Sequence, residues 1–392
     1  MNVRISKMLA TLAPSATLAV AEKAAALRAA GKSVVDFSAG QPDFDTPAHI
    51  KAAVGKALEA GDTKYPSPVA GKTPLREAIC TYYKQHAGVS YEPAQVVVTV
   101  GAKDALHLAF ASLLDPGDEV IIPAPYWVSY PEQVRLFGGL PVILQSGVAR
   151  GGLISAAELR AAITPRTRAF VFSSPSNPSG ATYTRGELDA LAAVLREHDI
   201  IAISDELYHR LVFDGNPSAS LAACEGMIDR TLTVNGLSKT YAMTGWRLGF
   251  ACGPKPLVSA MARLQGQTTT GAASFIQTAA VTALLGDQTC VDAMRAAYRE
   301  RCEVMYAALQ QIAGVRCERP SGAYYCFPDV SGTFERLGVR NADGFAERLL
   351  ELAHVAVVSG SAFGCDTHIR LSFATGRDVV EEGMSRMVRA LK

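Results

Sequence analysis

The fold of this chain is decided by the stretch Thr231-Leu-Thr-Val-Asn-Gly-Leu-Ser-Lys239-Thr-Tyr-Ala-Met-Thr-Gly-Trp-Arg247. Its first four residues alternate β-branched and apolar side chains, a pattern typical of a buried strand. Asn235-Gly236 ends that strand, and Lys239 projects from the loop beyond it. A lysine at the end of a buried strand is poorly hydrated, which favours its neutral amine. A neutral amine condenses with aldehydes, whereas the alternative for an isolated Ser-Lys pair is an ordinary surface lysine after a turn.

Length and composition indicate a globular α/β protein with two domains. The chain has 392 residues, of which 49% are hydrophobic and 7% aromatic, and that length is too great for one small core. Its 38 basic and 37 acidic residues nearly balance, so nothing favours binding to nucleic acid or to an anionic membrane. No apolar run approaches the ~20 residues that span a bilayer, and the N-terminus lacks the apolar stretch of a secretory signal.

The eight cysteines indicate reduced thiols and no metal site. None of them forms a Cys-x-x-Cys pair, the spacing that many zinc and iron–sulfur sites use. Most of them lie in apolar runs, as buried free thiols do. We therefore expect no bound metal and a cytoplasmic location.

Strand-like runs alternate with helical patterns through the middle of the chain. The strand-like runs are 96–100, 119–123, 140–144, 168–172, 200–204, 231–234 and 248–252, and clear helical patterns cover 103–114 and 185–198. This alternation predicts an α/β fold with a mostly parallel sheet sandwiched by helices. The last run follows its predecessor without room for a helical crossover, so we expect it to run antiparallel to a neighbour.

The two ends of the chain predict a smaller α+β domain. Helical patterns cover 15–30, about 290–311 and 342–352, and short strand-like runs lie near 315–319, 323–327 and 368–373. This order of elements is typical of an α+β arrangement. We expect a large domain over residues 46–289, and a small domain formed by residues 290–392 together with the N-terminal arm, 1–45.

Residues with useful chemistry follow several of these strands, at the edge where open α/β sheets bind ligands. Gly101-Ala102-Lys103-Asp104 opens a helix, and small residues there expose backbone N–H groups that suit a phosphate. Trp127 can stack on a planar ring or line a substrate site. The alternative is core packing, above all for nearby Tyr130. Prolines and a glycine around Asn177 hold its amide as a directed donor, or simply form a rigid turn.

Asp205 and Tyr208 follow the run 200–204. A buried carboxylate needs a cation or hydrogen bonds, and a protonated pyridine nitrogen is such a cation. The pairing would strengthen electron withdrawal by the ring of pyridoxal phosphate (PLP), whose aldehyde suits Lys239. Tyr208, three residues on, could reach the ring oxygen. Because no structural requirement places this whole set at successive strand ends, the sequence predicts a PLP site.

An arginine lies in an otherwise apolar strand near the C-terminus, His368-Ile-Arg370-Leu-Ser-Phe373. A buried guanidinium binds a planar anion, and a carboxylate can meet it with two hydrogen bonds. An α-amino acid supplies such a carboxylate. The alternative is an internal salt bridge.

Together these motifs resemble the fold-type I PLP enzymes, specifically class I aminotransferases of the bacterial aspartate aminotransferase branch. The resemblance runs from Pro14-Ser15-Ala-Thr17 to the strand of Arg370. Its motifs are Gly40-Gln-Pro-Asp43-Phe-Asp-Thr-Pro47, Lys64-Tyr65-Pro-Ser-Pro-Val-Ala-Gly71, Tyr126-Trp127-Val-Ser-Tyr130, Ser174-Pro-Ser-Asn177-Pro-Ser-Gly180, Ser204-Asp205-Glu206, and Ser238-Lys239 through Gly245-Trp246-Arg247.

The resemblance implies a role for each candidate residue. Lys239 forms the Schiff base with PLP and later moves the proton at the substrate Cα, while Asp205 pairs with the pyridine nitrogen. Tyr65 resembles the residue that reaches the phosphate of the neighbouring subunit, which implies a homodimer with shared active sites. The resemblance also implies three sets of contacts. The ring oxygen is contacted by Tyr208 and Asn177, and the phosphate by Gly101, Ala102, Lys103, Ser238 and Arg247. The substrate carboxylate is bound by Arg370, Asn177, Trp127 and the Gly40 backbone.

Two positions depart from the pattern of the branch. Many relatives carry a lysine two residues before the Ser-x-Thr motif, where it helps to bind a distal carboxylate, and this chain has Ala13 there. Without that cation, a distal carboxylate needs another basic partner, which the sequence does not place. The second departure is Asp104, where glutamine is commoner; a helix start tolerates its charge.

The implied activity is a ping-pong exchange of an amino group between an L-α-amino acid and a 2-oxo acid, through PLP and its amine form. The first expectation is aspartate or glutamate with 2-oxoglutarate or oxaloacetate. The alternatives are an aromatic, prephenate or neutral amino acid aminotransferase, and a PLP lyase or synthase, which would use the same Lys239 and Asp205. A non-catalytic sensor module would need a basic DNA-binding domain, for which this chain has neither room nor charge.

Overall fold

The computed structural model describes residues 3–6, 8–9, 12, 16–213 and 219–392. Its central sheet has the strand order β2-β8-β7-β6-β5-β3-β4. All neighbouring strands run parallel except β8, which is antiparallel to both β2 and β7. The strands are β2 (Val96–Thr99), β3 (Glu119–Pro123), β4 (Leu140–Leu144), β5 (Thr167–Ser173), β6 (Ile201–Asp205), β7 (Thr231–Gly236) and β8 (Gly249–Cys252). The expected sheet, including its antiparallel last strand, is confirmed.

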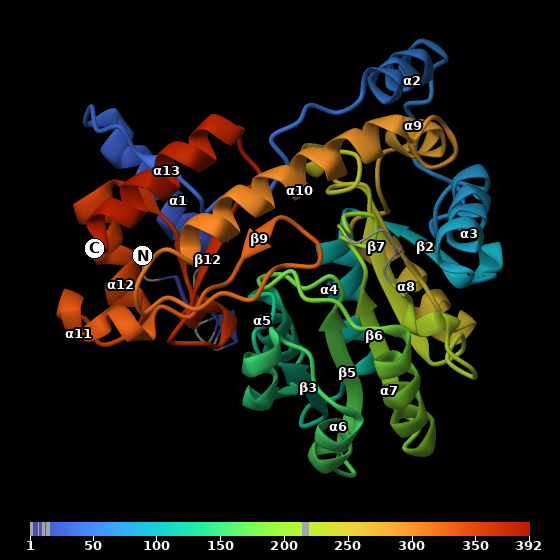
Figure 1. Ribbon diagram of the computed structural model, residues 1–392. Coiled ribbons are helices and arrows are strands. Elements are labelled where there is room, and N and C mark those ends of the chain that lie inside the picture. The colour runs from blue at the N-terminus through green and yellow to red at the C-terminus, as the bar shows by residue number, and fades with distance from the viewer. Residues whose placement is uncertain (1–2, 7, 10–11, 13–15, 214–218) are drawn as a thin grey trace.

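Helices cover both faces of this sheet (Figure 1). Alternate residues of β5 show the two faces: Phe170 and Phe172 pack in one apolar cluster with α7, and Ala169 and Val171 pack in another with α4 and α8. The helices of this lobe are α2 (Ala48–Glu59), α3 (Thr73–Ala87), α4 (Ala102–Leu113), α5 (Ser129–Leu136), α6 (Ala156–Ala162), α7 (Arg185–Glu197), α8 (Lys255–Gln267) and α9 (Ser274–Leu285). Strands buried on both faces read as continuous apolar runs, which is why their positions were predictable.

The two ends of the chain form a second lobe, where α1 (blue) lies beside the C-terminal elements (red) in Figure 1. β1 pairs with β10 in parallel, and β12 lies between β11 and β9 with antiparallel pairing. The elements of this lobe are α1 (Ala16–Ala29), β1 (Val35–Asp36), α10 (Thr289–Leu309), β9 (Tyr325–Cys326), α11 (Phe334–Leu337), α12 (Ala342–Ala353), β10 (Val355–Ala356), β11 (Val358–Ser359), β12 (Ile369–Ser372) and α13 (Arg377–Ala390).

One predicted strand was wrong. The run 315–319 forms no strand and makes only a single bridge, between Arg316 and Asp329. Pro320 follows the run directly; a proline has no N–H to donate to a ladder. The predicted partner strand shrinks to β9, two residues long.

The register of the parallel strands brings their carboxyl ends to one edge. Ser173 at the end of β5 is opposite Asp205, which is in turn opposite Val234 of β7. The strand ends two residues after Val234, and the loop that carries Lys239 follows it. Side chains from three separate strand ends therefore meet at this edge of the sheet. Among the described residues, no helix is long and apolar enough to cross a membrane.

Candidate active site

Lys239 lies just beyond β7 and is half-buried. Its Nζ donates a hydrogen bond to the carbonyl of Gly40 and lies 6.0 Å from the ring centroid of Tyr324. Burial above all, together with the charges of Arg370 and Arg247, lowers the pKa of Lys239 to about 7, and Asp205 partly opposes the shift. The amine is therefore available in its neutral form near neutral pH, as expected from its position at a buried strand end.

Asp205 ends β6 with a side chain that is 6% exposed. Its carboxylate accepts hydrogen bonds from the Tyr130 hydroxyl at 2.7 Å and the Leu207 N–H at 3.2 Å. Burial raises the pKa of Asp205, while the bond from Tyr130 holds it down. Tyr130, for which the sequence left core packing as the alternative, thus contacts the site directly; its place one turn along from Trp127 was the available signal.

Arg370 lies in β12 with 2% of its surface exposed. Its Nη1 donates to the Asn177 side-chain oxygen at 3.0 Å, and its Nη2 donates to the Ser38 carbonyl at 2.8 Å. Its Nε has no partner among the described residues. The guanidinium stacks 4.5 Å from the ring centroid of Tyr325. A charged donor group held in this way, with one N–H unused, suits an anionic ligand.

Tyr208 and Gly40 adjoin the same arginine. The Tyr208 hydroxyl lies 2.8 Å from that of Tyr325, and a methyl group placed on Gly40 would lie 3.5 Å from the Tyr325 hydroxyl and 3.9 Å from Arg370 Nη2. Sequence reasoning missed Tyr325 because it comes from the second lobe, and no local pattern indicates which strand end it meets.

The start of α4 forms a cradle with Arg247. Gly101 precedes the helix with φ of +85°, and a Cβ built on it would lie 2.6 Å from Arg247 Nη2. Ala102 opens the helix, so its N–H is free of intrahelical partners. Asp104 accepts a hydrogen bond from the Val100 N–H at 2.9 Å, which gives the departure from glutamine a structural use. Ser238 is buried, beside Lys239.

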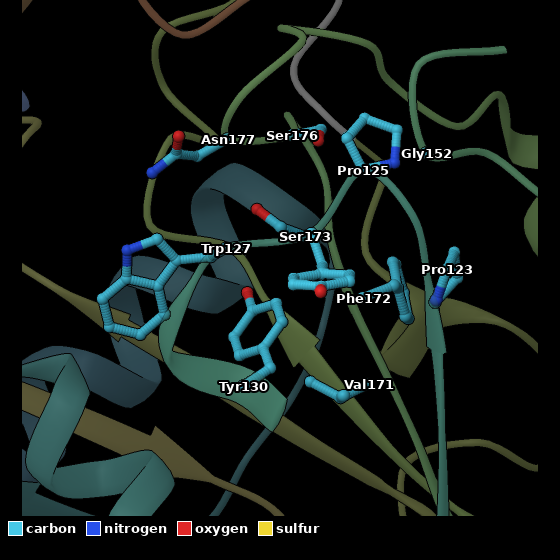
Figure 2. A pocket seen from close by; sticks show the side chains of 11 residues that line it. Pro123, Pro125, Trp127, Tyr130, Gly152, Val171, Phe172, Ser173, Ser176 and Asn177 are labelled. Atoms are coloured by element: carbon cyan, nitrogen blue, oxygen red, sulfur yellow. The ribbon is translucent and has the colours of Figure 1, made fainter. Parts of the chain in front are cut away.

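Trp127 and Asn177 line one pocket at this edge, beside the Asp205-bound Tyr130 (Figure 2). The Nζ of Lys103 lies 5.0 Å from the centroid of the Trp127 ring, and burial lowers the pKa of Lys103, with the charge of Arg247 adding to the effect. The residues that line the pocket are Pro123, Pro125, Tyr126, Trp127, Tyr130, Gly152, Val171, Phe172, Ser173, Ser176 and Asn177.

Two of the sequence candidates stand apart from this group. Tyr65 is 85% exposed on the surface of its own chain. Ala13 lies outside the described residues. In the described part of the chain, no three His, Cys, Asp or Glu side chains gather as metal ligands.

These residues fit PLP on three observations. Asp205 is buried without an ion pair among the described residues, Arg370 keeps an unused N–H, and the space in front of Gly101 has no room for a side chain but is bordered by a guanidinium. Such features match a ring cation, a carboxylate and a phosphate respectively. A buried amine and a buried acid at the strand ends of a fold with this sheet define a fold-type I PLP enzyme.

Comparison with known proteins gives the family. Residues 32–387 match the model of the family Aminotransferase class I and II. An aspartate aminotransferase of Geobacillus stearothermophilus is 45% identical over 100% of this chain and 99% of its own length. An aspartate/prephenate aminotransferase of Cereibacter sphaeroides is 47% identical over 98% of this chain and 97% of its own. The structure of Thermus thermophilus aspartate aminotransferase with maleate superposes with a TM-score of 0.94, at 42% identity, over 100% of both chains.

The chain therefore belongs to the class I and II aminotransferases. It is a transaminase of a PLP-dependent class, and it exchanges an amino group between an α-amino acid and a 2-oxo acid. The fold, the family and the activity expected from the sequence are confirmed.

Proposed function

We propose that PLP attaches to Lys239 and that aspartate is the preferred amino donor. Bound PLP supplies an aldehyde for amines and a ring that withdraws electrons from the reacting carbon. The observation that carries the cofactor assignment is the buried pair of Lys239 and Asp205, each of which shifts the pKa of the other at the end of adjacent strands.

Each residue of the site then has a separate role. A pKa of about 7 lets the Lys239 amine accept and release a proton near neutral pH, which suits it to move the proton at the substrate Cα. Asp205 holds the proton of the ring nitrogen, and Tyr130 orients Asp205. Arg370 and Asn177 bind the substrate α-carboxylate beside Gly40. The ring oxygen is assigned to Tyr208 and Asn177, and the phosphate to Gly101, Ala102, Lys103, Ser238 and Arg247.

Preference for aspartate is supported by the relatives, two of which are named aspartate aminotransferase and aspartate/prephenate aminotransferase. The Thermus thermophilus relative was solved with maleate, which is a dicarboxylate.

The test is a panel of half-reactions, in which aspartate, glutamate, phenylalanine, prephenate's amination product and alanine are each mixed with the holoenzyme. We expect aspartate to convert the cofactor to its amine form fastest. Substitution K103M should lower kcat/KM for aspartate and for alanine alike, by about tenfold, because a charge-assisted contact with the phosphate serves every amino donor. Release of pyruvate and ammonia without amino transfer would instead identify a lyase.

We also propose a cytoplasmic homodimer in which Tyr65 serves the partner's site. Its 85% exposure is unusual for a large aromatic side chain, and Leu58 and Leu285 are exposed on the neighbouring helices α2 and α9. All eight cysteines are free, as in a reducing compartment. The proposed domains remain 46–289, and 290–392 with 1–45. Mixing Y65F chains with K239A chains tests the dimer: a hybrid dimer has one intact site only if each site draws on both chains.

A further inference from the structure

The loop that carries Tyr65 is attached at both ends to the body of its own lobe. This Tyr65 loop, residues 63–71, lies between α2 and α3 and reaches the surface at Tyr65, which is 85% exposed. Pro66, the next residue, is buried. The chain therefore turns inward immediately after Tyr65, which limits the directions that the tyrosine can take.

Asp62 and Lys72 close the base of the loop. The Lys72 Nζ lies 2.7 Å from Asp62 Oδ2, and the two side chains are 27% and 22% exposed. Thr278 of α9 joins them, because its hydroxyl accepts a hydrogen bond from Lys72 at 2.8 Å and donates one to Asp62 at 2.6 Å. These three residues, the loop base, connect two points of the chain that are ten positions apart. A network of this kind restrains a structure more than an isolated surface ion pair does.

Two buried glutamines hold the backbone beside the loop base. Gln277 of α9 is 1% exposed, and its Oε1 accepts a hydrogen bond from the Lys72 N–H at 2.8 Å. Gln265 of α8 is fully buried, and its Nε2 donates to the carbonyls of Val69 at 2.8 Å and Val98 at 2.9 Å. The second end of the loop is thereby fixed to both helices and to the sheet.

The loop also bonds to β2, the edge strand of the central sheet. The Val98 N–H donates to the Ala70 carbonyl at 2.8 Å. Gly71 follows with φ of +112°, and a Cβ built on it would lie 2.5 Å from Val98 Cγ2, so the approach requires glycine. All these contacts come from one lobe of one chain, so the shape of the loop is set without a partner.

We propose that Asp62, Lys72 and Thr278 are positioning residues, which hold Tyr65 in the orientation in which it enters the partner's site, so that each chain controls the retention of cofactor by the other. The proposal rests on the proposed homodimer, and it names the residues that prepare Tyr65 for its role there. A group held in place beforehand loses less conformational freedom when it binds. The loop base acts through Tyr65 and not on the cofactor itself.

The test places one substitution, K72M, in two kinds of hybrid dimer, which are isolated with two affinity tags. The loss of lysine-bound cofactor is followed by its absorbance. In a hybrid of a K72M K239A chain with a wild-type chain, the remaining Lys239 belongs to the wild-type chain, and its site receives Tyr65 from the altered chain. In a hybrid of a K72M chain with a K239A chain, the remaining Lys239 receives Tyr65 from the chain with the intact loop base.

We expect cofactor release to be about threefold to tenfold faster in the first hybrid, bounded by the loss of one hydrogen bond to a charged group, and unchanged in the second. A defect confined to the altered chain would give the opposite order and would overturn the proposal, as would equal release from both hybrids.

Y65F in the same two arrangements is the reference for the proposed dimer. If Y65F acts across the dimer and K72M does not, the role of the loop base is wrong and the shared site stands. If Y65F has no effect across the dimer, the shared site itself is contradicted. Because Lys72 acts through Tyr65, the homodimer of Y65F K72M should release cofactor no faster than that of Y65F. Additive effects would also count against the loop base.

Hydrogen exchange of the homodimers gives a second reading if K72M folds poorly. T278V removes the hydroxyl from the loop base and T278S keeps it, so the two form a matched pair. K255M is the control for loss of a lysine charge, because Lys255 forms an ion pair with Glu92 at 2.7 Å elsewhere in the same lobe. Exchange over 63–71 should accelerate in K72M and T278V but not in T278S or K255M. Equal exchange in T278V and T278S would contradict the proposal.

Discussion

Buried carboxylates have different partners at the two edges of the same sheet. At the amino end of β3, Glu119 is 5% exposed and is held by Arg166 at 2.5 Å and by the Thr164 hydroxyl at 2.6 Å. At the carboxyl end of β6, Asp205 is 6% exposed and has a hydroxyl and a backbone N–H but no ion pair among the described residues. A hydrogen bond from Thr164 keeps the pKa of Glu119 low, whereas burial raises that of Asp205.

This difference distinguishes charges that stabilise the fold from charges that are available to bind a ligand. A buried charge without a partner destabilises a protein, so it persists where a ligand completes it. Lys239 and Arg370 follow the same rule: the first is shifted toward its neutral form and the second has an unused Nε. Charges at the carboxyl edge should therefore control activity, and charges at the amino edge should control stability alone.

The largest effect is expected at Lys239. Substitution K239A removes both the amine that holds PLP and the group that moves the proton. Turnover should fall by about 10⁴-fold, the upper end of what a positioned acid–base group contributes, measured as kcat with aspartate and 2-oxoglutarate. The folded state should persist, as shown by an unchanged far-UV circular dichroism spectrum. Turnover close to that of the wild type would remove Lys239 from its assigned role.

Arg370 comes next in expected effect. Substitution R370A should lower kcat/KM by about 10²–10³, because a buried, hydrogen-bonded charge pair is worth roughly 2–5 kcal/mol. R370K is the matched control, since it keeps the charge but loses the two-pronged geometry, and it should fall between the wild type and R370A. The three values are read from initial rates over a range of aspartate concentrations. If the lysine variant matched the wild type, a planar bidentate contact would not be in use.

The pH dependence of stability offers a third test, on the cofactor-free protein. The pKa of Lys239 is about 7 in the fold and near 10.5 when exposed, so between these values the unfolded state binds more protons than the folded state. The penalty for burying the charge is full below pH 7, and the free energy of unfolding should rise with pH through that window. The rise should be absent in K239M, which should be more stable than the wild type at pH 6. The assignment would be contradicted if urea unfolding gave the same change in the free energy of unfolding between pH 6 and pH 9 for the wild type and for K239M.

The smallest effect concerns Glu119, at the amino edge. Substitution E119Q removes the charge that Arg166 and Thr164 hold, so the free energy of unfolding should fall by about 1–2 kcal/mol. Neither kcat nor KM should change, because no residue of the site contacts this pair. Urea unfolding and steady-state rates measure the two quantities separately. A loss of activity without a loss of stability would break the comparison between the two edges.

The sequence predicted the parts of the site that follow a single strand. Lys239, Asp205 and Gly101 each come directly after a buried apolar run, and the edge at which such runs end is set by parallel pairing. The buried position of Arg370 was also predictable from its apolar strand, whereas its binding of an anion stays a prediction. These assignments depend on local patterns, which a single sequence contains.

Contacts between distant segments were not predictable. Tyr325 meets Tyr208 across the two lobes, and the Ser38 carbonyl meets Arg370, although 117 and 332 residues separate the partners. Which segments meet there depends on tertiary packing, between the lobes for Tyr325 and within the second lobe for Ser38, and not on hydrophobic periodicity. The failed strand at 315–319 has a different cause, because its apolar and polar alternation was real but Pro320 ended the pairing.

The most direct test of the central claim is to reduce the holoenzyme with borohydride, digest it and locate the cofactor by mass spectrometry. Reduction fixes PLP covalently to the amine that carries it. We expect the phosphopyridoxyl group on the peptide that contains Lys239, and on no other lysine. Its presence on Lys103, or its absence from every peptide of an enzyme that transfers amino groups, would contradict the assignment of the buried lysine at the end of β7.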